Sequence, residues 1–181
     1  MKLKVISGEK KGFILKVPND TRPLSSRAKS ALFSILDEYI KGSAILDLYA
    51  GSGALGIEAL SRGAEYVEFI DISKEATDII EENIEKTQMQ DKSEVYRIPA
   101  EIYVKKNKNI KLFDIIFVFQ PYDKTNENIL KNAKKLLNNK GIIVFEKEKN
   151  KNIRNIKGLR VVDERTYGKT SILFYILSPE E

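Results

Sequence analysis

One stretch decides the fold of this chain: Ala44-Ile-Leu-Asp-Leu-Tyr-Ala-Gly-Ser-Gly-Ala-Leu-Gly-Ile-Glu-Ala-Leu-Ser-Arg-Gly-Ala64. It opens with an apolar run, residues 44–48, that predicts a buried strand, and it ends in an amphipathic helical pattern. Between the two lie Gly51, Ser52 and Gly53, where glycine lets the backbone approach a ligand closely. A strand, a glycine turn and the free N–H groups of a helix N-terminus together predict a nucleotide-binding corner.

The glycine spacing fits the dinucleotide-binding fingerprint, with Gly51, Gly53 and Gly56 in register. The next apolar run, residues 66–70, ends at Asp71, which follows Gly51 by twenty residues. A carboxylate at that distance can accept hydrogen bonds from the hydroxyls of a ribose. The alternative interpretation is a tight strand-to-helix turn in some other α/β domain.

The charge of Asp47 favours one kind of nucleotide over another. This acid stands near the end of the first strand, just before the glycine turn. A carboxylate there repels a pyrophosphate such as that of NAD, whereas it attracts the sulfonium and ammonium groups of S-adenosylmethionine. A second interpretation is that Asp47 caps the loop by accepting its backbone amides, and both roles can hold together.

Length and composition bound the remaining possibilities. A chain of 181 residues predicts one domain, residues 21–181, with a β-hairpin extension over residues 1–20. There is no Cys and no His, which excludes thiolate nucleophiles, disulfides, Cys/His zinc sites and histidine bases. Methyl transfer from a sulfonium needs few such groups, because the leaving group is already activated and alignment is the main task.

Charge and hydropathy indicate the setting. The net charge of +5 permits a nucleic-acid partner. No apolar run approaches the ~20 residues of a membrane span, and no long apolar segment follows the basic start. We therefore expect a cytoplasmic protein without membrane or metal, and a monomer because no oligomerisation stripe is present.

The N-terminal segment predicts a hairpin and then a helix. Residues 2–7 and 13–17 read as short strands, and the turn between them carries Lys10 and Lys11. These lysines are either solvated charge or phosphate contacts. Ser25 or Ser26 caps a helix that runs to about residue 39. A basic edge that we interpret as an RNA or phosphate contact is formed by Arg22, Arg27 and Lys29.

Strands and helices alternate along the rest of the chain. We expect strands at residues 66–71, 94–98, 113–119 and 141–146, helices at 74–86 and 127–137, a basic loop at 105–111, and a closing antiparallel hairpin of 159–167 with 170–177. Such alternation predicts an α/β fold with a doubly wound, Rossmann-like sheet that is mostly parallel. Ligands of such sheets bind outside the carboxyl ends of the strands, where Asp47, Asp71, Pro99 and residues 119–122 all fall.

Three segments together resemble the RsmD-type family of bacterial methyltransferases: residues 21–36, 46–64 and 167–175. Members of this family use S-adenosylmethionine to methylate the exocyclic amine of a guanine in small-subunit ribosomal RNA. The donor motif starting at Asp47 follows the family almost without change, and Arg22-Pro23 with Arg27 fits its N-terminal motif. The resemblance covers nearly the whole chain and implies a Rossmann-like methyltransferase sheet.

The resemblance also implies the site. The donor would be held by Asp47, Tyr49, Gly51, Ser52, Gly53, Asp71, Ile72 and Ala100. The partner would be ribosomal RNA or the small-subunit particle, with a guanine swung out of its stack. The family's catalytic loop, Asp-Pro-Pro-Tyr, aligns with Phe119-Gln120-Pro121-Tyr122. Gln120, Pro121 and Tyr122 are thus the expected catalytic residues.

Two departures from the family pattern bear on activity. Phe119 has no acceptor where the family's acidic side chain accepts a hydrogen bond from the target amine, although the amide oxygen of Gln120 can substitute. Pro99 stands where the family often has an acid near the adenine. Three hypotheses follow: an active RNA methyltransferase, a degenerate relative that binds donor and RNA but transfers methyl slowly or not at all, and, third, a nicotinamide-dependent oxidoreductase.

Overall fold

The computed structural model describes residues 3–19, 23–108, 110–121, 127–153 and 155–179. Seven strands form one sheet in the order β5-β4-β3-β6-β7-β9-β8. The strands are β3 (Ala44–Leu48), β4 (Tyr66–Asp71), β5 (Ser93–Arg97), β6 (Phe113–Val118), β7 (Leu137–Glu148), β8 (Leu159–Tyr167) and β9 (Thr170–Leu177). The pairs from β5 through β7 are parallel, and β9 runs antiparallel to both β7 and β8. The predicted α/β class, with a mostly parallel sheet and a closing antiparallel hairpin, is confirmed.

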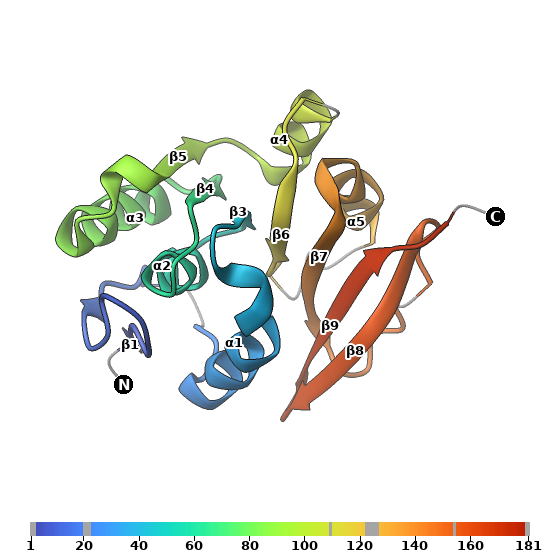
Figure 1. Ribbon diagram of the computed structural model, residues 1–181, viewed down its shortest axis with the longest axis horizontal. Helices are drawn as coiled ribbons and strands as arrows, with labels where there is room; N and C mark the ends of the chain where they lie inside the picture. The colour runs from blue at the N-terminus through green and yellow to red at the C-terminus, as the bar shows by residue number, and fades with distance from the viewer. Residues whose placement is uncertain (1–2, 20–22, 109, 122–126, 154, 180–181) are drawn as a thin grey trace.

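Helices cover both faces of the sheet (Figure 1). One face carries α1 (Ser26–Ile40), α2 (Ala54–Ser61), α3 (Lys74–Thr87) and the N-terminal hairpin of β1 (Leu3–Lys4) and β2 (Ile14–Leu15). The other face carries α4 (Ala100–Asn107) and α5 (Asn128–Ala133). Alternation along the strands divides the core accordingly, so that Ile45 packs with the first set and Leu46 with the second.

Several boundaries differ from the sequence-based expectation. The N-terminal strands, expected at 2–7 and 13–17, are only Leu3–Lys4 and Ile14–Leu15. Residues 100–107 form a helix, because Ala100, Tyr103 and Val104 repeat at helical spacing and are buried, so only the end of the expected 105–111 loop is loop. The helix expected at 127–137 ends at Ala133, followed by the 3-10 turn Lys134–Leu136. Strand β7 therefore begins at Leu137, which is buried and continues into the sheet.

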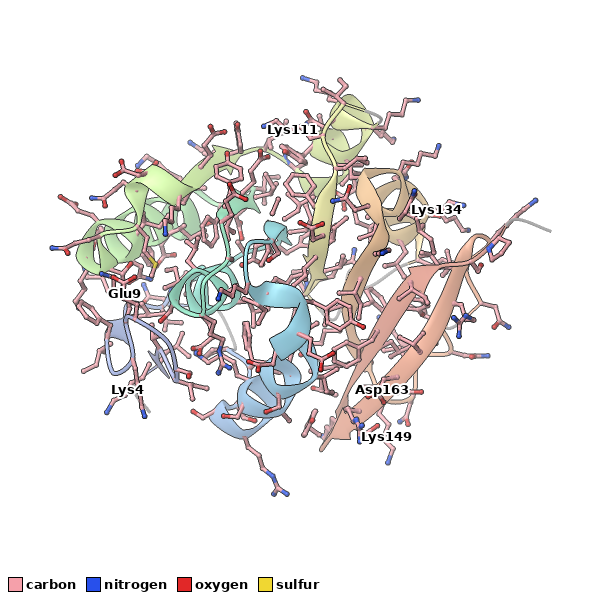
Figure 2. All side chains as sticks on the ribbon, viewed as in Figure 1. Lys4, Glu9, Lys111, Lys134, Lys149 and Asp163 are labelled. Atoms are coloured by element: carbon pink, nitrogen blue, oxygen red, sulfur yellow. The ribbon has the colours of Figure 1, made fainter. Side chains whose placement is uncertain are left out.

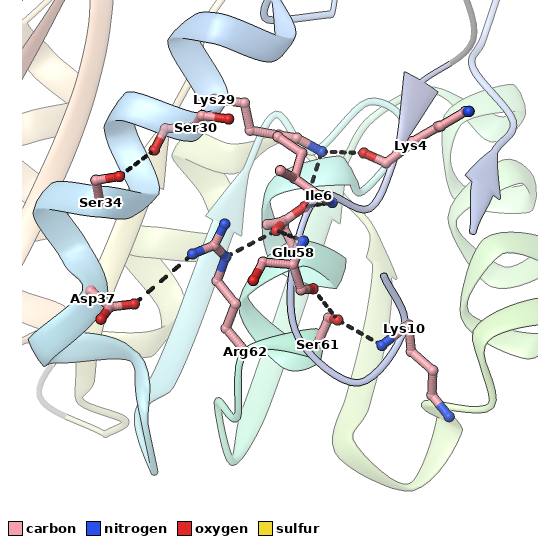
Figure 3. Close-up of polar contacts among 11 residues, drawn as sticks. Lys4, Ile6, Lys10, Lys29, Ser30, Ser34, Asp37, Glu58, Ser61 and Arg62 are labelled. Carbon is pink, nitrogen blue, oxygen red and sulfur yellow. Dashed lines mark hydrogen bonds and ion pairs between the residues drawn. The ribbon is translucent and has the colours of Figure 1, made fainter. Parts of the chain in front are cut away.

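A buried ionic network fastens the N-terminal hairpin segment to the sheet domain (Figure 3). Glu58 on α2 is fully buried, and its carboxylate accepts the backbone N–H groups of Ile6 at 2.7 Å and Ser7 at 3.0 Å. The same carboxylate lies 3.1 Å from Lys29 Nζ and 2.9 Å from Arg62 Nε. Each charge is compensated, as the low dielectric of the interior requires.

The network corrects one prediction. We expected Lys29 to contact RNA, but its side chain is buried, with Nζ donating to the carbonyl of Lys4 at 2.7 Å. The buried stripe of α1 includes Lys29, Phe33, Leu36 and Ile40, at spacings of four, three and four residues. Burial lowers the pKa of Lys29, while the nearby Glu58 carboxylate acts in the opposite direction.

Replacing Glu58 with alanine is expected to lower the free energy of unfolding by about 3–5 kcal/mol, because the buried Lys29 ammonium loses its counter-ion and two backbone amides lose their acceptor. The matched control is Asp37→Ala, which removes the other carboxylate near Arg62, at 3.9 Å on a side chain that is 76% exposed. Such an exposed pair is worth about 1 kcal/mol or less. Urea unfolding of both variants measures the difference, and equal losses would contradict the account.

Candidate functional site

The glycine corner forms as predicted between β3 and α2. The chain adopts positive φ angles at Tyr49 (59°), Gly51 (58°) and Gly53 (72°), the last being the residue that precedes the first helical residue of α2. The N–H of Gly51 donates to Asp71 Oδ2 at 2.9 Å, which ties the turn to the end of β4. Tyr49 is not a glycine, so its left-handed backbone stores strain at this position.

Gly56 is required by packing and not by backbone conformation. A Cβ atom at this position would lie 2.3 Å from Phe69 Cε1 and 2.8 Å from Val67 Cγ1, both on the adjoining strand β4. The third glycine of the fingerprint therefore lets α2 pack closely against the sheet.

The variant Gly56→Ala is expected to lose about 1–3 kcal/mol of stability, because the rigid ring of Phe69 has to move. Alanine would otherwise stabilise a helix interior by about 1 kcal/mol. Thermal unfolding of the variant and of wild type shows whether the substitution lowers or raises stability. An increase in melting temperature would contradict the close packing.

Asp47 lies under the glycine turn. Asp47 is 2% exposed, and its carboxyl group accepts the N–H of Gly56 at 3.1 Å, so it anchors the first turn of α2 and not an amide of the loop itself. Burial raises the pKa of Asp47 to about 8, with the charge of Asp71 adding to the rise and the Gly56 hydrogen bond opposing it. A positive charge placed beside this carboxyl group would be strongly favoured.

Asp71 and Ile72 stand at the end of β4. Asp71 accepts the N–H of Gly51 through Oδ2 and that of Ser73 through Oδ1, each at 2.9 Å. Each carboxylate oxygen has two lone-pair sites, so both retain capacity for a hydroxyl donor. Ile72, the next residue along the chain, is 65% exposed.

The remaining predicted donor contacts line the same region with their backbone. Ser52 is buried, and its carbonyl accepts Asn83 Nδ2 at 2.9 Å. Ala100 is buried and is the first residue of α4, directly after the N-cap residue Pro99. The structure therefore brings the predicted donor-binding residues to the carboxyl ends of the neighbouring strands β3, β4 and β5.

The end of β6 joins this corner through a chain of side-chain hydrogen bonds. Gln120 is 2% exposed, and its Nε2 donates to the hydroxyl of Tyr49 at 3.1 Å. That hydroxyl in turn donates to Glu101 Oε1 at 2.6 Å. Burial is the larger cause that raises the pKa of Tyr49, and the hydrogen bond to Glu101 raises it further. The phenol therefore stays protonated. Sequence reasoning missed Glu101, because only the fold places the start of α4 beside β3.

The other residues of the aligned catalytic loop have different surroundings. Phe119 is half-buried against the core on the α1 face, edge-on to Phe117 with ring centroids 6.3 Å apart. Pro121 is exposed, and Tyr122 lies outside the described residues. The phenyl ring of Phe119 thus occupies a core position, whereas the Gln120 carboxamide reaches the corner.

The predicted RNA contacts have different surroundings. Lys11 and Arg27 are exposed, and Arg22 lies outside the described residues. Lys10 pairs with Glu9 at 2.8 Å, and its backbone N–H donates to Ser61 at the C-terminal end of α2. The hairpin turn is therefore about 12 Å of helix away from the glycine corner.

Neither a metal cluster nor a membrane-spanning helix is present in the described parts of the chain. No group of three or more candidate ligating side chains there could hold a metal ion. None of the helices described there has the length and apolarity to cross a membrane.

The comparisons with known proteins agree with this architecture. A solved structure of the Escherichia coli protein yhhF superposes with a TM-score of 0.88 at 24% identity, covering 98% of this chain and 99% of that one, which shows the fold. A second solved structure, SMU.776, whose title describes it as complexed with SAH, has a TM-score of 0.72 at 13% identity over 91% of this chain and 53% of its own.

The sequence comparisons establish the family. The ribosomal RNA small subunit methyltransferase D of Buchnera aphidicola is 33% identical over 98% of this chain and 94% of its own length. The protein of that name from Haemophilus influenzae is 32% identical over 96% of this chain and 93% of its own. The family described as "Conserved hypothetical protein 95" matches residues 3–176. The chain thus belongs to this family, the RsmD-type RNA methyltransferases.

Proposed function

We propose that this protein transfers a methyl group from S-adenosylmethionine to the exocyclic amine of a guanine in small-subunit ribosomal RNA. The observation that carries the choice of donor is the buried Asp47 carboxyl group beneath the glycine turn. A sulfonium or ammonium group beside Asp47 gains a favourable ion pair, whereas a pyrophosphate would be repelled.

The rest of the corner supports an adenosine. Asp71 keeps acceptor capacity for two ribose hydroxyls, and the exposed side chain of Ile72 offers an apolar surface for a purine ring. Gly51 and Gly53 leave the backbone accessible to the methionine part of the donor. The relative whose title includes SAH shares only the fold with this chain, and it is consistent with this choice.

Gln120 is the residue we propose for positioning the target amine. Its Nε2 is held by Tyr49, so the orientation of the carboxamide is fixed by a donor–acceptor chain that ends at Glu101. Its backbone carbonyl and its amide oxygen are acceptors, and two acceptors aim the lone pair of the amine at the methyl group. The guanine has to leave its stack to reach this position.

A radiolabelled methyl-transfer assay tests this proposal. The substrate is small-subunit RNA transcribed in vitro, and therefore unmodified, both free and assembled with ribosomal proteins. We expect label in RNA, recovered after nuclease digestion as guanosine methylated on its exocyclic amine. Label on another atom or base would overturn the assignment of the target.

Phe119 gives the degenerate alternative a specific basis, because its ring supplies no acceptor and packs into the core. Under that alternative the protein binds S-adenosylmethionine and RNA, yet the assay shows no label above that of a heat-inactivated sample. The oxidoreductase hypothesis instead requires NAD to bind more tightly than the methyl donor.

A further inference from the structure

A cationic surface lies on α4 and the segment that follows it, away from the N-terminal hairpin and α1. Residues 100–112 contain four lysines, Lys105, Lys106, Lys108 and Lys111, against one acid, Glu101, a net charge of +3 out of +5 for the whole chain. All four lysines are exposed. Figure 2 shows Lys111 beside α4, where nitrogen-tipped side chains project away from the body of the protein. We call this region the α4 surface.

Exposed apolar side chains are interspersed with these charges. Ile102 is 44% exposed, Ile110 73% and Leu112 53%, three of the eight large apolar side chains that are exposed in the described residues. Apolar side chains that lie close to one another in the chain and are all exposed can be covered by the apolar part of a ligand. Their presence beside the lysines indicates a surface that binds a ligand with both apolar and anionic parts.

A pocket of about 310 Å³ opens at the same place, between α4 and the edge strand β5. Its lining combines the ring of Tyr96, the apolar Ile98, the carboxamide of Asn107 and the cations Arg97 and Lys111. The wall is rigid, because Tyr96 packs on Tyr103 with ring centroids 5.7 Å apart. An aromatic face, an amide and two cations together suit a nucleobase with its phosphate.

Ordinary structural roles explain only part of this surface. Lys105 and Lys106 stand in the last turn of α4, where they also complement the helix dipole. Lys111 pairs with the buried Glu68 carboxylate, yet its side chain is 43% exposed and still borders the pocket. These roles do not account for Lys108, Ile110 and Leu112. They do not account for the pocket either.

One wall of the pocket lies beside the strand end that holds the glycine corner. The N–H of Ile98 donates to the carbonyl of Asp71 at 3.0 Å, and the Asp71 side chain in turn accepts the N–H of Gly51. Helix α4 begins at Ala100, one of the predicted donor-binding residues, and its eight residues span about 12 Å. An RNA strand with one nucleotide at the glycine corner is therefore within a few nucleotides of the α4 surface.

We propose that the α4 surface binds single-stranded RNA next to the target nucleotide, with one unpaired base in the pocket and the neighbouring phosphates on the lysines. This inference rests on the proposed function for the identity of the polymer. It adds a second contact region, on the α4 face of the sheet, to the hairpin and α1 residues predicted from the sequence.

The salt dependence of binding tests the lysines. The triple variant Lys105→Gln/Lys106→Gln/Lys108→Gln is compared with Lys41→Gln/Lys92→Gln/Lys140→Gln, which removes three exposed lysines elsewhere and so carries the same net charge. The probe is a short fluorescein-labelled single-stranded RNA, followed by fluorescence anisotropy. For the first triple we expect the slope of log K against log salt to fall by about 2, at about 0.7 per lost phosphate contact, and for the second to stay unchanged.

The pocket is tested by Tyr96→Leu, with Tyr39→Leu on α1 as the matched control, since Tyr39 is 45% exposed and lies on the opposite face. Loss of one stacked base lowers the affinity roughly tenfold. Equal slopes for the two triples together with unchanged affinity for Tyr96→Leu would overturn the proposal, and would leave an acidic protein segment as the occupant to examine. That result would not affect the proposed methyl-transfer function. Failure of the wild-type protein to bind any RNA would overturn both proposals.

Discussion

Replacing Asp47 with asparagine is expected to weaken the binding of S-adenosylmethionine on the order of a hundredfold. Asparagine keeps the shape of the side chain, and its amide oxygen can still accept the N–H of Gly56, so the glycine turn should persist. Only the negative charge beside the donor's cationic groups is lost. Calorimetric titration of both proteins measures the difference.

A ligand comparison separates charge from shape in this experiment. S-adenosylhomocysteine lacks the sulfonium charge, so the substitution should reduce its affinity less than that of S-adenosylmethionine. Equal losses for the two ligands would mean that Asp47 acts through the loop and not through the ion pair.

The raised pKa of Asp47 adds a pH signature to the same prediction. In the folded protein the carboxyl group has a pKa of about 8, against 3.8 for the ordinary side chain. Below that value the group has to release a proton before it can pair with the donor, so affinity rises with pH towards 8, by at most about tenfold per pH unit. Asp47→Asn should bind with no such dependence.

Stability should change with pH in the opposite direction. Between pH 3.8 and about 8 the folded protein keeps a proton on Asp47 that the unfolded chain has already lost. The free energy of unfolding therefore falls as pH rises through this window, by up to about 1.4 kcal/mol per pH unit. Relative to wild type, Asp47→Asn should gain stability towards pH 8. A constant difference between the two proteins across the window would contradict the buried, protonated carboxyl group.

The double variant Phe119→Asp/Gln120→Pro is expected to raise methyl-transfer turnover roughly a hundredfold. It restores the acidic residue that the family's loop carries at this position, and a carboxylate there would have to turn away from the core to accept the target amine. It also removes the bond from Gln120 to Tyr49, so any gain has to come from the new acceptor. Turnover at saturating donor and RNA is the measurement.

The matched control is Phe119→Leu/Gln120→Pro, which makes the same change at Gln120 but keeps an apolar side chain in the core at residue 119. It should lose activity, because both the carboxamide and any new carboxylate are absent. Equal turnover in the two double variants would show that this loop does not position the amine. Thermal unfolding of both variants verifies that each remains folded.

Short-range sequence patterns predicted several elements of the fold correctly. The strand-turn-helix at residues 44–61, the cap at Ser25 and the closing hairpin all follow from short-range signals: apolar period, glycine and serine position. The end of α5 and the early start of β7 do not follow from such signals, because the pairing of Leu137 with Phe113 across the sheet decides that boundary.

The buried charges mark the limit of sequence reasoning. Lys29 and Glu58 lie far apart in the chain and each looks like a surface residue by type, yet they form one ion pair at 3.1 Å. The signal was present in part, since Lys29 precedes Phe33 by one helical turn on the same face. The link from Gln120 through Tyr49 to Glu101 had no such signal, because three separate elements supply its members.

The most direct test is calorimetric titration of the wild-type protein with S-adenosylmethionine and, separately, with NAD. The account predicts that S-adenosylmethionine binds at one site and more tightly than NAD, with affinity that rises as the pH is raised from about 6 towards 8. Tighter binding of NAD, or no heat from either ligand, would contradict the proposal that the corner with Asp47 and Asp71 binds S-adenosylmethionine.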